Sequence, residues 1–329
     1  MKYQIITIGG CLKDIFIKAP SEILFKGKWM GRRRKYIAYP YGDKVSIDEL
    51  TYDFGGCSFN AAINFSGLGI KTAFATVLGD DSLSSEAWER IKQKKVRTDF
   101  IKKEKNSYLG FSVVLIGEDG DRSILTYRAK NDFSKIDLDK ILRSTDSIYL
   151  SGVNQSSGVL QDKLFNKINS KKKKLYLNPS GFQLKQNKTK LKKLISKSEV
   201  VAMNLNEASE LLEVKNAKIK NVLGDIYDLG AKSIIITNGK EGAYFYDGKR
   251  FLKIGLYPAK RISSTGSGDC FFSTFIAAGF KGYSIDESLK LASINSASVI
   301  KNYGAQKGLL NWEPLIKRLK QNKVRVTEI

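Results

Sequence analysis

The feature that most constrains the fold of this 329-residue chain is a series of short, continuously apolar segments. Each is apolar at nearly every position instead of alternating with polar residues, which is typical of strands covered on both faces of a parallel sheet. The segments span residues 3–9, 72–78, 147–152, 174–178, 199–204 and 233–238. Helix-like stretches separate them, at residues 58–69, 81–95, 158–171, 206–214 and 222–231. This alternation predicts a doubly wound α/β sheet.

Two regions interrupt the alternation and predict a second, smaller sheet. Residues 15–54 contain short strand-like pieces, and residues 107–130 form two alternating strands around a turn at 117–122. We expect both regions to build one antiparallel sheet, a lid beside a cleft. A small sheet with an apolar face tends to pair with another sheet, so we expect a homodimer through the lids. Residues 1–329 are expected to form a single domain that carries this lid.

The chain contains no histidine, which excludes every Ser-His or Cys-His catalytic pair and every histidine-ligated metal. A general base must therefore be Asp, Glu, Lys, Tyr or Cys. The three cysteines, Cys11, Cys57 and Cys270, lack metal-site spacing and are expected to be reduced. No apolar run reaches the roughly 18 residues that cross a bilayer, and the first residues do not resemble a secretory signal. We therefore expect a cytoplasmic protein without a membrane partner.

The balance of 56 Lys+Arg against 33 Asp+Glu gives a net charge of +23. Such a charge permits contact with nucleic acid or a membrane surface. The basic residues are spread along the chain, however, and only residues 31–36 and 170–175 are dense. We expect the second cluster on a solvated turn between a helix and a strand, and we do not expect a nucleic-acid partner. A basic protein also attracts anionic substrates such as ATP.

The segment RISSTGSGDCFFSTFIAAG, residues 261–279, carries the clearest chemical signal. Its glycines, Gly266 and Gly268, precede an apolar small-residue helix, so free N–H groups and the helix dipole favour an anion there. Asp269 falls in the first helical turn, where it would either cap the helix or act as a base. Phosphoryl transfer needs both an anion site and a base for the acceptor hydroxyl. The chain has no Walker motif, and the catalytic loop of protein kinases requires a histidine.

This loop resembles the second signature of the PfkB (ribokinase-like) carbohydrate kinases, which often reads D-T-x-G-A-G-D. Other segments of the chain resemble further motifs of the family in the same order, and together the resemblance covers nearly the whole chain. They are IGGCLKD (8–14), FGGCSFNAAINFSGLG (54–69), LGDD (78–81), NLNE (204–207), TNGKEG (237–242) and NYGAQKG (302–308). The resemblance implies a ribokinase-like fold and a kinase that uses Mg²⁺ and ATP to phosphorylate a hydroxyl of a sugar or related polyol.

The resemblance also assigns roles by position. Asp269 would be the catalytic base, and Gly266, Ser267 and Gly268 the anion hole. Asp14, Gly55, Gly56 and Asn60 would hold the acceptor. Thr237, Gly239 and Gly242 would line the ATP site, Asn204 and Glu207 would order Mg²⁺ through its waters, and Asn295 would lie near the adenine.

Several of these residues also have a purely structural interpretation. Asp14 would be a turn residue, Asn60 would bond its own backbone, Glu207 would complete a capping box with Asn204, and residues 237–242 would be only a hairpin turn. Arg128 in the lid would either grip an acidic or phosphorylated substrate or be a solvated charge.

The loop departs from the signature at its start, where Ser263 and Ser264 replace the leading Asp-Thr. In several relatives that aspartate helps to bind a monovalent cation, so potassium dependence is in doubt. Two other functions stay open. One is a nucleoside kinase of the same fold, with aromatic residues near Trp29 stacking a base. The other is a basic, non-catalytic binding protein, which loss of Asp269 or of the glycine loop would have favoured.

Overall fold

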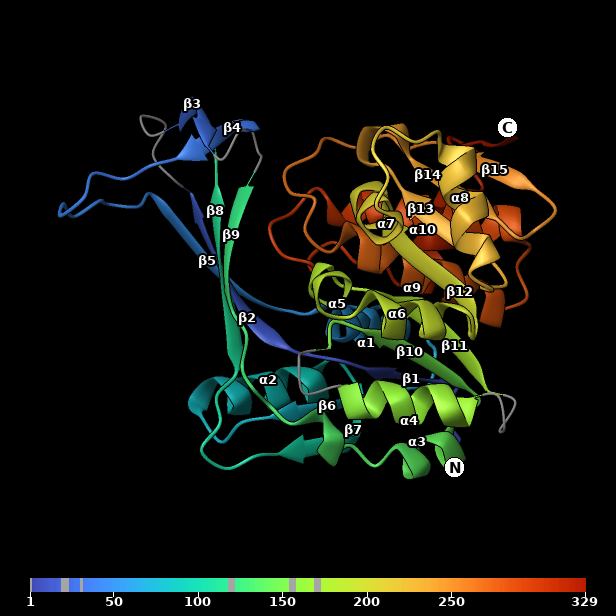
Figure 1. The fold of residues 1–329 in the computed structure, drawn as a ribbon, viewed down its shortest axis with the longest axis horizontal. Coiled ribbons are helices and arrows are strands. Elements are labelled where there is room, and N and C mark those ends of the chain that lie inside the picture. The colour runs from blue at the N-terminus through green and yellow to red at the C-terminus, as the bar shows by residue number, and fades with distance from the viewer. Residues whose placement is uncertain (1, 19–23, 30–31, 118–121, 154–157, 169–172) are drawn as a thin grey trace.

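The apolar segments form the centre of a ten-stranded sheet in the computed structural model, which describes residues 2–18, 24–29, 32–117, 122–153, 158–168 and 173–329 (Figure 1). From one edge to the other the strands are β7 (Arg97–Lys103), β6 (Thr72–Leu78), β1 (Ile5–Ile8), β10 (Ser147–Ser151), β11 (Lys174–Asn178), β12 (Ser198–Asn204), β13 (Ile234–Thr237), β14 (Ala243–Tyr246), β15 (Phe251–Ile254) and β16 (Val326–Glu328). Strands β7 to β13 pair in parallel, and β13 to β16 pair antiparallel. The prediction of a mostly parallel sheet is confirmed.

Helices cover both faces of this sheet. One face carries α3 (Leu138–Ser144), α4 (Gly158–Ile168), α6 (Lys188–Ile195), α7 (Leu205–Leu212) and α8 (Ile219–Asp228). The other face carries α1 (Cys57–Gly67), α9 (Ser267–Phe280), α10 (Ile285–Val299) and α11 (Trp312–Leu319). The short α5 (Gly181–Gln186) follows β11, and α2 (Ser82–Gln93) follows β6. Within the described residues, no helix is long and apolar enough to span a membrane.

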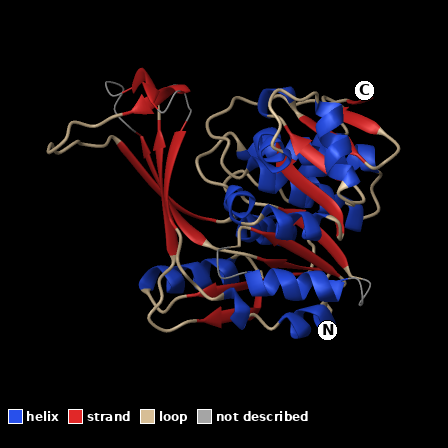
Figure 2. Cartoon of the chain, in the orientation of Figure 1, coloured by secondary structure: helices blue, strands red, loops and turns tan. Residues whose placement is uncertain are grey.

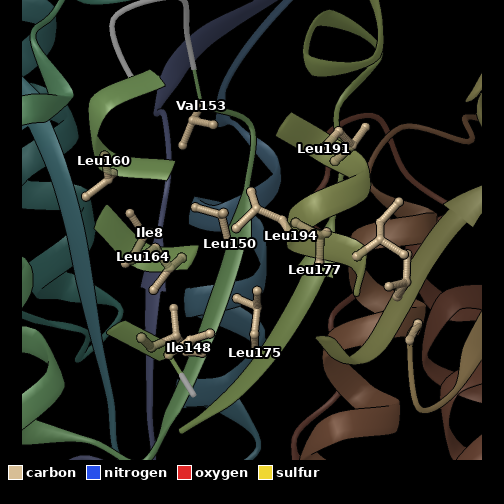
Figure 3. Close-up of a cluster of buried hydrophobic side chains, with 14 of the residues drawn as sticks. Ile8, Ile148, Leu150, Val153, Leu160, Leu164, Leu175, Leu177, Leu191 and Leu194 are labelled. Carbon is tan, nitrogen blue, oxygen red and sulfur yellow. The ribbon is translucent and has the colours of Figure 1, made fainter. Parts of the chain in front are cut away.

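Successive residues of a buried strand reach opposite faces of the sheet. In β10, Ile148 and Leu150 pack against the helices of one face, in the cluster that Figure 3 shows with Leu164 and Leu194. Tyr149, between them in sequence, belongs to the core cluster on the other face. Both sides of the strand are therefore buried, which explains why its sequence is apolar throughout.

The lid is a four-stranded sheet in the order β5 (Glu49–Gly55), β2 (Leu12–Lys18), β8 (Gly110–Ile116) and β9 (Arg122–Tyr127). Figure 2 shows these strands standing away from the helical body. One expectation was wrong, since the central pair β2–β8 is parallel and only the outer pairs are antiparallel. The reason lies in the main sheet, where β1 and β7 run parallel and each leads through a short connection into β2 or β8.

The second departure is the separate two-stranded sheet of β3 (Leu24–Trp29) and β4 (Arg32–Ile37), which does not join the four lid strands. Most of the expected turn at 117–122, and parts of the basic stretches 31–36 and 170–175, lie outside the described residues.

Candidate active site

The N-terminus of α9 has the backbone geometry of an anion site. Gly266 is the N-cap residue, with φ 75°, and a Cβ there would lie 2.3 Å from the Cβ of Ala305. Only glycine tolerates both conditions. A Cβ at Gly268, by contrast, would meet no atom within 4 Å, so the backbone there is open to a ligand. The N–H groups of the first turn have no acceptor within the helix, and the helix dipole favours an anion beside them.

Asp269 is 9% exposed and is held by amide groups from two other elements. Asn60 in α1 donates to Asp269 Oδ2 over 2.9 Å, and Asn178 donates to Asp269 Oδ1 over 3.1 Å. No side chain caps α9 in the described structure, so the helix-cap interpretation of Asp269 does not fit. Burial raises the pKa of Asp269, and hydrogen bonds from Asn60, Cys57 and Asn178 oppose that rise. A raised pKa suits a general base.

Asn178 was missed by sequence reasoning. It ends β11, and its amide group also donates to the Tyr149 hydroxyl over 3.1 Å. Its place at the carboxyl end of an expected parallel strand was the available signal, because ligand sites in open α/β sheets lie at that edge.

The first cavity, of about 260 Å³, lies between the lid and α9, and we call it the acceptor cavity. Asp14, Gly56, Asn60, Arg128, Gly266 and Asp269 all line it. Asp14 lies in β2, so the turn interpretation is wrong. Asn60 does not bond its own backbone through its side chain, and its Oδ1 is buried with no partner among the described atoms. That oxygen is placed to accept from a ligand hydroxyl.

Asp14 is a buried carboxyl group, 7% exposed. Burial, with smaller contributions from Asp53 and Asp269, raises its pKa to about 7, although a hydrogen bond from Ser112 opposes the rise. Gly55 packs directly against this side chain, since a Cβ at position 55 would lie only 2.1 Å from Asp14 Oδ2. Gly55 is not among the described residues that line the cavity, and its lack of a side chain makes room for Asp14.

A second cavity of about 300 Å³ adjoins the first, and we call it the phosphate cavity. Asn204 and Glu207 line it and also form the capping box of α7, each accepting a 2.9 Å bond from the other's backbone N–H. Burial raises the pKa of Glu207 to about 7. No group of three potential metal ligands occurs among the described residues. Mg²⁺ often keeps several waters and takes phosphate oxygens as ligands, so this donor set fits an ion held largely through water.

A third cavity, of about 570 Å³, is lined by Thr237, Gly239, Gly242, Ser267 and Gly268, and we call it the nucleotide cavity. Residues 237–242 do form the turn between β13 and β14, so the hairpin interpretation and the cavity role hold together. Asp269 and Gly266 line both the acceptor and the phosphate cavities, whereas Thr237 and Gly268 line both the phosphate and the nucleotide cavities. The cavities thus follow one another along the start of α9.

The expected position of Asn295 near the adenine is not what the structure shows. Asn295 is fully buried, donates to Asn64 Oδ1 over 3.1 Å and to Thr274 Oγ1 over 2.9 Å, and accepts from the Leu310 N–H. Its neighbours Ser293 and Ser296 line the nucleotide cavity instead. Asn295 lies on the side of α10 that faces the core, where its amide group links α10 to α1 and α9 through hydrogen bonds.

Arg128 follows β9 and is exposed. Its guanidinium lies over the Phe182 ring at 5.1 Å from the centroid. It lines both the acceptor cavity and the phosphate cavity, so it stands where these two spaces meet.

Comparison with known proteins agrees with this geometry. The family model described as pfkB family carbohydrate kinase matches residues 29–312. An ATP-dependent 6-phosphofructokinase of Thermoanaerobacterium thermosaccharolyticum is 24% identical over 315 residues, covering 92% of this chain and 90% of that protein. A 5-dehydro-2-deoxygluconokinase of Clostridium perfringens is 24% identical over 328 residues, covering 90% and 96%.

Among solved structures, the ribokinase of Arabidopsis thaliana, complexed with ribose and ATP, superposes with a TM-score of 0.79 at 20% identity, covering 97% of this chain and 99% of that chain. The fold is therefore ribokinase-like. Since the family model spans most of the chain, this protein belongs to the pfkB family of carbohydrate kinases, which are phosphotransferases.

Proposed function

We propose that the protein transfers the γ-phosphoryl group of ATP to a hydroxyl group of a sugar or sugar-like acceptor. The observation that carries this proposal is the position of Asp269, a residue that lines both the acceptor cavity and the phosphate cavity. A base at the junction of these spaces is what in-line transfer to a hydroxyl requires.

Asp14 and Asn60 bind acceptor hydroxyls, and Asp269 takes the proton of the hydroxyl that attacks. As the new oxygen–phosphorus bond forms, the bond to the ADP oxygen breaks, and the N–H groups of the first turn of α9 hold the negative charge on the phosphoryl oxygens. Thr237, Gly239 and Gly242 line the space for the nucleotide, and Asn204 with Glu207 orients the waters of the metal. ATP supplies the phosphoryl group, and Mg²⁺ neutralises charge on its β- and γ-phosphates.

The names of the relatives support a sugar-type acceptor, because they are an ATP-dependent 6-phosphofructokinase and a 5-dehydro-2-deoxygluconokinase. A nucleoside acceptor is the runner-up within the same fold. A non-catalytic binding protein is disfavoured because Asp269 and the glycine loop are both present and connected to cavities.

The test is ADP release by the purified protein with Mg²⁺ and ATP, across ribose, fructose, sugar acids, sugar phosphates and nucleosides. We expect release that depends on a sugar-type acceptor. Release with nucleosides alone would establish the runner-up. ATP binding without ADP release for any acceptor would support the non-catalytic alternative.

A further inference from the structure

Asn178, the last residue of β11, contacts the proposed base without contacting the acceptor cavity. In the register of β10 and β11, Tyr149 pairs with Tyr176, and Ser151 pairs with Asn178. Alternate residues of a strand share one face of the sheet. Tyr149 and Tyr176 belong to the core cluster that includes residues of α9, so the side chain of Asn178 lies on that same face, beside the start of the helix.

Two amide groups hold the two oxygens of the Asp269 carboxyl group separately. Asn60 Nδ2 donates to Oδ2 over 2.9 Å, and Asn178 Nδ2 donates to Oδ1 over 3.1 Å. The Cys57 thiol donates as well, but a thiol is a weak donor. The last torsion of an aspartate side chain has only a broad preference, so a single donor would let the carboxyl plane turn. Donors on both oxygens, from α1 and from β11, fix that plane.

Tyr149 fixes the direction of the Asn178 amide group. An amide nitrogen carries two hydrogens, and the second N–H of Asn178 donates to the Tyr149 hydroxyl over 3.1 Å. The Tyr149 ring is fully buried and packs against Phe65 and Phe272, with ring centroids 5.9 Å and 5.4 Å away. Because both N–H groups are engaged, Asn178 has no donor left for a phosphoryl oxygen. Its contribution is therefore to hold Asp269 and not to bind the phosphate.

We propose that Asn178 is a positioning residue for phosphoryl transfer: it holds the Asp269 carboxyl group in the orientation that takes the proton of the acceptor hydroxyl, and Tyr149 acts through Asn178. This inference rests on the proposed function and adds two residues that the sequence motifs do not contain. The proton moves from the hydroxyl to Asp269 as the oxygen–phosphorus bond forms. Such a step depends closely on geometry, since a misplacement of about 1 Å can cost on the order of 100-fold in rate.

The two asparagines that hold Asp269 differ in what else they contact. Asn60 lines the acceptor cavity, and its buried Oδ1 has no partner among the described atoms, so it can accept from an acceptor hydroxyl. Asn178 lines the phosphate cavity and is absent from the described linings of the other two cavities. Loss of Asn60 should therefore change both kcat and the acceptor KM, whereas loss of Asn178 should change kcat alone.

The experiment measures steady-state kinetics of Asn178→Ala and Asn60→Ala with an acceptor that supports ADP release by the wild type. In Asn178→Ala we expect kcat to fall about 10–100-fold, the range for a hydrogen bond to a charged group, while KM for acceptor and ATP changes less than about threefold. Asn60→Ala should lower kcat and also raise the acceptor KM.

Asn187→Ala is the matched control for loss of an asparagine hydrogen bond. Asn187 caps α6 by accepting from the Lys190 N–H over 2.9 Å, and it lies outside the described cavity linings. The variant should lower the melting temperature through loss of the cap and leave kcat unchanged. A kcat loss in this control as large as in Asn178→Ala would attribute the effect to stability and overturn the proposal.

Tyr149→Phe keeps the buried ring and removes only the hydroxyl that accepts from Asn178. We expect a smaller fall in kcat than in Asn178→Ala, again with KM unchanged. Because Tyr149 acts through Asn178, the double variant should lose no more kcat than Asn178→Ala alone. Independent losses that multiply in the double variant would overturn this coupling and with it the proposal.

Two further outcomes separate the positioning role from the kinase function. Wild-type kcat in Asn178→Ala, or a loss confined to KM, would overturn the positioning role and leave the kinase function intact. A wild-type protein that releases no ADP with any acceptor would contradict the kinase function and the positioning role together.

Discussion

At the scale of single residues, the catalytic proposal depends on one carboxylate, Asp269. Asp269→Asn keeps the shape of the side chain and removes the base, so we expect turnover to fall roughly 10²–10⁴-fold, the usual contribution of a positioned general base. ATP affinity should hardly change, because the substitution leaves the nucleotide cavity untouched. The melting temperature should also hardly change, because the loss of one hydrogen bond to the carboxylate is offset by the loss of a buried charge, which is costly. Steady-state kinetics at saturating ATP and a thermal melt measure both.

Asp269→Ala is the companion variant. It should lose as much rate as Asp269→Asn, whereas a purely structural role would make the alanine variant unstable and the asparagine variant active. Full turnover in Asp269→Asn with a confirmed acceptor would contradict the role of Asp269 as the general base.

Asp14 makes the stability of the protein depend on pH. Its folded-state pKa is raised from 3.8 to about 7, so between these values the folded protein keeps a proton that the unfolded chain has released. Stability therefore falls as pH rises from about 4 to about 7. Relative to wild type, Asp14→Asn should gain about 2–3 kcal/mol in free energy of unfolding between pH 5 and pH 7. Urea unfolding at both pH values measures this, and parallel changes in the two proteins would contradict it.

Ser263 stands where relatives place an aspartate for a monovalent cation. It is buried, its hydroxyl donates to Thr265 Oγ1 over 3.2 Å, and it supplies no charge. We expect activity to differ by less than about threefold between potassium and a large organic cation, which is under about 1 kcal/mol in transition-state free energy. Mg²⁺ should remain essential in the same assay. Strong activation by potassium would show that other oxygens build a cation site.

At the scale of elements, the sequence predicted what depends on local pattern. β6 has the predicted bounds because a run buried on both faces is apolar throughout. The parallel pairing of β2 with β8 was not predictable in this way, since it depends on which distant segments meet. Asn295 shows the same limit, because its motif position did not reveal which side of α10 faces the core. Asn178 stood at the end of an expected strand, but its contact with Asp269 depends on how β11 and α9 lie together in the fold.

The start of α9 offers a paired test of structure against chemistry. Gly266→Ala places a side chain at φ 75° and against Ala305, so it should destabilise the protein by at least about 1–2 kcal/mol from the left-handed backbone alone. Gly268→Ala meets no atom within 4 Å and lies inside the helix, so it should leave the melting temperature nearly unchanged. Its methyl group would nevertheless enter the space for the phosphoryl oxygens, and turnover should fall. Equal melting temperatures for the two variants would contradict this assignment.

At the scale of the whole molecule, one face of the lid sheet carries exposed apolar side chains among the described residues. Leu50, Tyr52 and Leu125 are 45%, 56% and 61% exposed. Tyr52 and Leu125 lie across from Ile15 and Val113 in the same register, so these side chains share the face that turns away from Asp14 and Ser112. An apolar sheet face of this kind marks an interaction site, and the face is present in every copy of the chain.

We therefore expect a homodimer in which the two lids pack together, each covering the other's apolar face and stabilising the sheet that holds Asp14. Light scattering should give twice the 36.8 kDa of one chain at the concentrations used for kinase assays. Leu125→Asp places a charge in that face and should yield a monomer with weakened acceptor binding, because the lid loses its support. Val159→Asp is the matched control, an exposed apolar residue on α4 outside the lid, and should stay dimeric. A wild-type monomer, or a dimer that survives Leu125→Asp, would show that the lid face has another role.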